Sequence, residues 1–195
     1  IITALMLVVG CSKPIDDETL IEEGGLKYHP ETKELYSGDV FKNYLGGKTE
    51  YEGSYKNGKQ DGKWTYWWEN GQKGAEETYK NGELDGKSTS WHENGQKMME
   101  GNWKNGKPWD GKQILWHQNG QKQSELTIKD GELDGKAYGW YENGQKEYEG
   151  TYKDGKEDGL WTYWFVFGQK EEERTYKDGE LISTKRWNED GSVKE

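Results

Sequence analysis

Two histidines stand at positions whose spacing could support a metal site. His92 and His117 each follow a recurrent tryptophan directly, so they occupy equivalent places in the chain. A zinc ion takes three or four protein ligands, and no further candidate ligand recurs beside this pair. We therefore expect no metal site, and we treat His92 and His117 as solvent-facing residues that are candidates for contact with a partner.

Acidic side chains form a second set of candidates. An aspartate recurs before a glycine, at Asp61, Asp85, Asp110, Asp134 and Asp158. The spacing matches neither the EF-hand loop nor the nonapeptide calcium repeat. Asp-Gly also fits turn geometry without any ligand. We expect turns here, and no calcium.

A column of glutamates recurs together with a column of lysines. The glutamates are Glu76, Glu100, Glu125, Glu149 and Glu173. Neighbouring carboxylates can act as general acid and base, but rows of opposite charges on a sheet are normally solvated cross-strand pairs. No nucleophile stands with a base in this chain. The sequence therefore predicts a protein that is not an enzyme, with no catalytic residue, metal or cofactor.

These columns belong to a repeat of about 24 residues, which is typical of repeat architectures. Each unit contains a tryptophan four residues before a turn glycine. The tryptophans are Trp67, Trp91, Trp116, Trp140, Trp164 and Trp187, and the main glycines are Gly71, Gly95, Gly120, Gly144 and Gly168. We interpret both columns as structural.

Turn signals and short apolar runs indicate antiparallel hairpins. Asn-Gly and Asp-Gly favour type I′ turns. We expect such a two-residue loop at Asn70-Gly71, with Trp68 opposite Lys73 and Tyr66 opposite Ala75. A second, wider turn closes each unit. The predicted fold is all-β, an elongated, twisted antiparallel meander of hairpins over residues 28–195, without helices beyond a signal segment.

Burial in this fold must come from aromatic side chains, because aliphatic residues are scattered singly beyond the first units. We expect the face that carries the recurrent tryptophans to be the buried one, with rings packed on neighbouring rings and lysine stems. Specific binding is expected where the repeat breaks. The candidate partner-binding residues there are Trp109, next to an inserted proline, and Phe165 and Phe167, which belong to an apolar patch where Phe167 replaces asparagine.

The start of the chain differs from the rest. Residues 1–10 are apolar and have the length of a signal-peptide core, and Val8-Val9-Gly10-Cys11 resembles the lipobox of bacterial lipoproteins. That resemblance implies that Cys11 carries lipid and is the mature N-terminus. The initiator methionine and basic segment are expected to precede Ile1. Residues 11–27 are interpreted as the lipidated cysteine and a flexible tether, with a capping element as the alternative.

The repeat pattern itself resembles a known family. Tyr-Lys-Asn-Gly-Lys followed by Gly-x-Trp and Glu-Asn-Gly-Gln-Lys is similar to the MORN-repeat variant of bacterial proteins, some of which are named as antitoxins of toxin–antitoxin systems. The resemblance implies a sheet of hairpins. It also implies protein scaffolding as a function and, for some members, phospholipid binding.

Charge narrows the choice of partner. The net charge of −10 disfavours nucleic acid and direct docking on anionic lipid, because both need a basic surface. We expect a lipid-anchored protein of the bacterial cell envelope, at the outer membrane or cell surface, that binds a protein partner along its sheet. The alternatives are a glycan- or cell-wall-binding module with exposed aromatic residues, and an antitoxin-like inhibitor of a partner protein.

Overall fold

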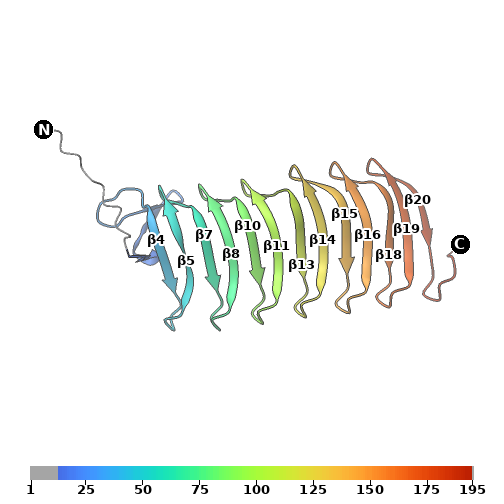
Figure 1. Ribbon diagram of the computed structural model, residues 1–195, viewed down its shortest axis with the longest axis horizontal. Coiled ribbons are helices and arrows are strands. Elements are labelled where there is room, and N and C mark those ends of the chain that lie inside the picture. The colour runs from blue at the N-terminus through green and yellow to red at the C-terminus, as the bar shows by residue number, and fades with distance from the viewer. Residues whose placement is uncertain (1–12, 195) are drawn as a thin grey trace.

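The computed structural model describes residues 13–194, so Cys11 and the apolar segment before it lie outside the described residues. The described chain forms one long, twisted sheet whose hairpins follow one another from the N-terminal to the C-terminal end (Figure 1). The prediction of an elongated antiparallel meander is confirmed. Within this range no helix has the length and apolar character that crossing a bilayer requires.

The main strands come in pairs, one pair to each repeat, with a last strand at the C-terminal edge. They are β4 (Gly38–Asn43), β5 (Thr49–Lys56), β7 (Gly62–Trp67), β8 (Lys73–Lys80), β10 (Gly86–Trp91), β11 (Lys97–Lys104), β13 (Gly111–Trp116), β14 (Lys122–Lys129), β15 (Glu132–Trp140), β16 (Lys146–Lys153), β18 (Gly159–Trp164), β19 (Lys170–Lys177) and β20 (Glu180–Arg186). Short strands after the tight turns extend the pairing at β6 (Lys59–Gln60), β9 (Glu83–Leu84), β12 (Lys107–Pro108) and β17 (Lys156–Glu157).

The two turns of each unit have the opposite types from those expected. The tight type I′ turn lies at Asn57-Gly58, where φ is 50° and 76° and Lys56 pairs with Lys59. At the Glu-Asn-Gly-Gln turn only the glycine has positive φ, 86° at Gly71. There the Gly71 amide donates to the Trp68 carbonyl, and the Trp68 amide donates to the Gln72 carbonyl, each at 2.8 Å. This is a longer loop with a bulge.

Because of this bulge, the observed strand register differs in part from the predicted one. Tyr66 lies opposite Ala75, as predicted, and Trp64 lies opposite Glu77. The pairing of Trp68 with Lys73 is wrong, since the register shifts after Tyr66 and places Trp67 opposite Lys73. A β-bulge inserts one unpaired residue into a strand, so a simple two-by-two count fails beyond it.

The buried face is not the one that carries the recurrent tryptophans. On one face, here called the core face, Trp64 and Trp161 are 1% and 3% exposed. On the other face, the ladder face, the recurrent tryptophans are only half-buried. The expectation that this column forms the buried core is therefore wrong, because the column lies among the charged glutamates and lysines.

Packing on the core face alternates between successive hairpins. A glycine of one hairpin lies beneath the large side chain of the next, and a Cβ added at Gly53 would come within 2.2 Å of the Trp64 ring. Gly150 is related in the same way to Trp161, at 2.1 Å. Each buried tryptophan thus fills the space that a missing side chain leaves on the neighbouring strand.

The expected tether is wrong for residues 13–27. They contain β1 (Ile15–Asp16), a single 3₁₀ turn η1 (Asp17–Thr19) and β2 (Ile21–Glu23), which pairs with β3 (Leu26–Tyr28). Strand β1 runs parallel to β4, and Leu20 is buried against Trp64 and Val40. The alternative, a capping element, describes this segment, which we call the N-terminal cap.

Candidate functional site

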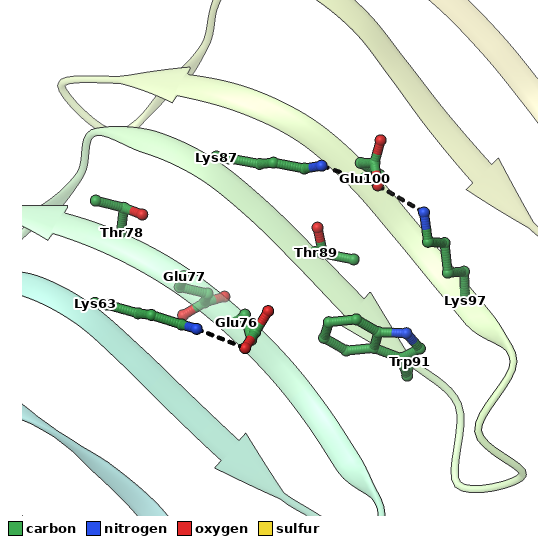
Figure 2. Close-up of a pocket in the computed structure, with 9 residues that line it drawn as sticks. All are labelled: Lys63, Glu76, Glu77, Thr78, Lys87, Thr89, Trp91, Lys97 and Glu100. Carbon is green, nitrogen blue, oxygen red and sulfur yellow. Dashed lines mark hydrogen bonds and ion pairs between the residues drawn. The ribbon is translucent and has the colours of Figure 1, made fainter.

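Glutamates of the ladder face are held between a lysine of the neighbouring strand and a lysine three residues earlier on their own strand. Glu76 accepts from Lys63 and Lys73 at 2.7 and 2.6 Å. Glu100 lies between Lys87 and Lys97 in the same way, as Figure 2 shows. Hydrogen bonds from these lysines, Lys63 first for Glu76, lower the pKa of the glutamates below the ordinary value. A general acid at neutral pH needs a raised pKa, so these carboxylates are structural acceptors.

The lowered pKa values predict a loss of stability in acid. The pKa of Glu125 is lowered most by its hydrogen bond from Lys112, then by Lys122. Because the folded pKa lies below the unfolded value, this contribution is complete above the unfolded pKa and is lost as the pH falls through the folded pKa. We expect the free energy of unfolding to fall once the pH drops below about 4.5, the ordinary value.

Urea titrations between pH 7 and pH 3 measure this effect. In Glu125→Gln, the decrease in the free energy of unfolding between pH 7 and pH 3 is expected to be smaller by up to about 1 kcal/mol, the scale of a partly exposed ion pair. Glu147→Gln is the matched control, since Glu147 makes no ion pair with any described residue. An unchanged acid limb in Glu125→Gln would contradict the assignment.

Five of the six recurrent tryptophans, all but Trp67, are covered on a ring face by a lysine from the preceding unit. The ammonium of Lys73 lies 5.6 Å from the Trp91 ring centre, and that of Lys97 lies 5.3 Å from Trp116. Lys122, Lys146 and Lys170 cover Trp140, Trp164 and Trp187 at 5.4–5.8 Å. These are cation–π contacts, which stand where contacts between successive tryptophan rings were expected and occupy surface that a sugar ring would need. Trp140 also stacks on Tyr138 at 5.7 Å.

The residue after the recurrent tryptophan bonds its unit to the next one in four units, at Trp68, His92, His117 and Tyr141, and Tyr44 does so at the corresponding place of the first hairpin. Tyr44, Trp68 and Tyr141 donate to the carbonyls of Trp67, Trp91 and Trp164. His117 Nε2 lies 2.7 Å from the Trp140 carbonyl, and His92 is placed in the same way on Trp116 at 3.3 Å. A carbonyl only accepts, so both imidazoles must carry hydrogen on Nε2. Both histidines therefore link one repeat to the next by a hydrogen bond. Residues 13–194 hold no group of three potential metal ligands.

Substitution of His117 tests this role. His117→Phe is expected to cost about 1 kcal/mol, because the Trp140 carbonyl loses its donor. His117→Tyr is expected to be nearly neutral, since tyrosine makes the same bond at positions 44 and 141. Chemical denaturation followed by circular dichroism measures both variants, and equal losses in the two would contradict a hydrogen-bonding role.

The other recurrent polar residues serve the same purpose. Asp85 accepts from the amide of Asn105, which is part of the following tight turn, and Asn94 donates to the carbonyl of Gln118 at 2.7 Å. The side chain of Gln72 lies against Gly95 of the next unit, where a Cβ would approach its Oε1 to 2.8 Å. These contacts account for the aspartate column without calcium.

The candidate residues at the breaks of the repeat lie apart from one another. Trp109 stands beside the tight turn after β14, where its ring is near Gly131 and Lys104 lies 4.1 Å from the ring centre. Phe165 and Phe167 stack with centres 5.2 Å apart. They occupy positions where other units carry a side chain that donates a hydrogen bond to the next unit. The unit that contains Phe165 and Phe167 therefore lacks these two hydrogen bonds to the last unit. Phe165 and Trp187 also line a polar hollow of about 530 Å³.

Sequence reasoning missed the central residues of the core face. Trp64 and Trp161 do not recur in every unit, so they stood outside the tryptophan column. The signal that could have found them is the glycine after the glutamate column, which appears only in alternate units at Gly53, Gly101 and Gly150.

Comparison with known proteins identifies the repeat. Residues 60–81, 84–105, 109–130 and 133–154 match the family described as MORN repeat variant. No curated protein matches the chain. These four segments are similar to the MORN repeat variant, which agrees with the sheet of hairpins that the sequence resemblance implies. Repeats of this kind are generally modules that bind proteins or membranes.

Proposed function

We propose that this protein is a non-enzymatic scaffold, anchored by lipid at the bacterial cell envelope, that binds protein partners along its sheet. The observation that carries this proposal is the bonding between successive units. The polar columns are engaged by the next unit, so the recurrent residues build a continuous, stiffly joined surface. An extended surface of this kind suits a macromolecular partner better than a small substrate.

Electrostatics and the aromatic contacts support a protein partner over the alternatives. A net charge of −10 disfavours nucleic acid and anionic lipid. Lysines cover one face of five of the six recurrent tryptophans of the ladder face, which disfavours stacking on sugar rings. The lipobox-like Val8-Val9-Gly10-Cys11 supports attachment through lipid on Cys11. An antitoxin-like inhibitor would be a special case of protein binding.

Site-specific photo-crosslinking in intact cells tests the scaffold. A photoreactive residue is placed at Lys87 on the ladder face, at Leu115 on the core face, or at Leu45 on the tip of a turn. We expect a discrete protein adduct from at least one face and none from Leu45. Adducts absent from both faces, or replaced by glycan, would overturn the proposal.

The anchor is tested separately from the scaffold. The intact mass of the mature protein is expected to show acyl chains on Cys11, and Cys11→Ser is expected to move the protein from the membrane to the soluble fraction. Cys11→Ser should bind anionic vesicles weakly or not at all. Strong vesicle binding by this variant would show that the sheet itself contacts lipid.

A further inference from the structure

A hollow of about 430 Å³ opens on the core face, where the hairpin of β7 and β8 meets the hairpin of β10 and β11. Tyr66, two residues after Trp64, lies opposite Ala75. Ala75 also lies opposite Ser90, which pairs with Met99 on its other side. Opposite residues of neighbouring strands share a face, so all four line the hollow from the core face. Every residue that lines it except Ser90 is half-buried or exposed, so the hollow is open to solvent.

Two small residues at the bulge between β7 and β8 create this hollow. Gly74 and Ala75 stand where the next unit has Met98 and Met99. The φ of Gly74 is not positive, so the backbone does not require a glycine there. A Cβ at this position would come within 3.3 Å of the indole nitrogen of Trp68. The missing side chain therefore leaves space beside Trp68. At the equivalent place, the other units carry Glu50, Met98, Gln123, Glu147 and Glu171.

Aromatic rings form much of the wall, and hydrogen bonds hold them in place. Trp68 donates from its indole nitrogen to the Trp91 carbonyl at 3.0 Å. The hydroxyl of Tyr66 accepts from the amide of Gln60 at 3.3 Å. The faces of such rings carry partial negative charge and attract cations. The thioether of Met99 adds polarizable surface that adapts to the shape of a ligand. The wall therefore suits a cation with apolar substituents.

The charged residues that line the hollow are carboxylates, and no described lysine or arginine lines it. Glu77 accepts from the Tyr79 hydroxyl at 2.7 Å, and Figure 2 draws no ion pair to it. Glu172, on the same face, shows the contrasting arrangement, since Arg174 and Arg186 bind it at 2.7 and 2.9 Å. A half-buried carboxylate is costly unless it is paired, so a bound cation would stabilise Glu77.

Two further polar groups at the hollow have unused bonding capacity. Glu50 binds Lys42 at 3.3 Å through one carboxylate oxygen, and its other oxygen makes no ion pair within the described chain. Ser90 is 8% exposed, and its hydroxyl makes no hydrogen bond with any residue in the described range. Buried hydroxyls are normally hydrogen-bonded, so Ser90 marks a place where a polar group of a ligand completes the bonding.

We propose that this hollow binds a small organic cation that carries a quaternary ammonium group and a hydroxyl. The ammonium group lies against Tyr66 and Trp68 with its charge toward Glu77, and the hydroxyl bonds to Ser90. The hollow has the size of a small-molecule site. A metal ion suits it less, since no three potential ligands come together in residues 13–194. This site goes beyond the scaffold function and does not depend on it.

Titration of the full chain with choline, followed through isotope-labelled methionine methyl signals, tests the proposal. Met98 and Met99 line the hollow and report on it directly. We expect saturable shifts of both signals. The neutral analogue of choline, in which carbon replaces nitrogen, is expected to bind about tenfold more weakly, because it keeps the shape and the hydroxyl but has no charge. Equal affinities would overturn the proposal, since the hollow would then not recognise a cation.

Three variants separate this site from general effects of charge. Glu77→Gln is expected to weaken choline binding about tenfold and to leave the neutral analogue unaffected. Gly74→Met introduces the residue that the next unit has at the equivalent place, and it should abolish choline binding by filling the hollow. Glu147→Gln is the matched control and should leave the affinity unchanged. Circular dichroism checks that each variant is folded, and Glu77→Gln suffices for the test if Gly74→Met is not.

Other outcomes would overturn the proposal. Methionine signals that do not respond to choline, or unaltered affinity in Glu77→Gln, would mean that the hollow is not a cation site. Tighter binding of a lysine amide than of choline would make the lysine side chain of a partner protein the occupant. Protein adducts from Leu115 or Lys87 in the crosslinking experiment would leave the scaffold function standing in each case.

Discussion

Trp64→Ala is expected to lower the free energy of unfolding by about 3–5 kcal/mol, the usual cost of removing a large buried aromatic side chain. Trp64 is 1% exposed and contacts four tyrosines, Tyr51, Tyr55, Tyr66 and Tyr79. Its loss leaves a cavity above Gly53, which has no side chain to fill it. Urea denaturation followed by circular dichroism measures the change.

Trp116→Ala is the matched comparison for this prediction. Trp116 is half-buried on the ladder face, and its main partner is the ammonium of Lys97. We expect a cost of about 1–2 kcal/mol, since a partly exposed ring loses less apolar burial and one cation–π contact. Equal losses in both variants would contradict the assignment of the core to the face that carries Trp64.

Gly53→Ala is expected to destabilise the protein by about 1–3 kcal/mol, the scale of overpacking in a core. The new Cβ would lie 2.2 Å from the Trp64 ring, so the indole must move away from the tyrosines around it. The backbone at this position does not need positive φ, so the effect isolates the clash.

Gly46→Ala is the control for this second prediction. A Cβ at Gly46 meets nothing within 4 Å, and its φ is not positive. It is expected to be neutral or slightly stabilising, because alanine restricts the unfolded chain. Gly53→Ala should also change near-ultraviolet circular dichroism, which reports on the packing of Trp64. A variant with native stability and spectrum would contradict the packing of Trp64 on Gly53.

The sequence was sufficient to predict the repeat, the hairpins and most of the register. Turn types were assigned to the wrong turns, because Asn-Gly fits both a type I′ turn and a bulged loop. The two differ in the φ of asparagine, which is positive at Asn57 and not at Asn70. The bulge after Tyr66 is what lengthens the second loop.

The buried face was predicted wrongly for a different reason. Recurrence was taken as a sign of burial, yet the recurrent Trp91 and Trp116 pair with lysines at the surface, whereas a buried tryptophan occurs at the place of Trp64 and Trp161 in only these two units. A tether was preferred to a cap for this segment because an acidic, glycine-containing segment is usually solvated, whereas the structure buries Asp17.

Large and small side chains alternate between successive hairpins on the core face, and this alternation limits how many hairpins can be gained or lost at once. Removing the single hairpin of β10 and β11 would place Glu77 beside Gln113, where Gly101 now lies. Removing two successive hairpins would place Glu77 beside Ala137, which keeps a large side chain next to a small one. Gain and loss of repeats are therefore expected in pairs, although the turns would permit single steps.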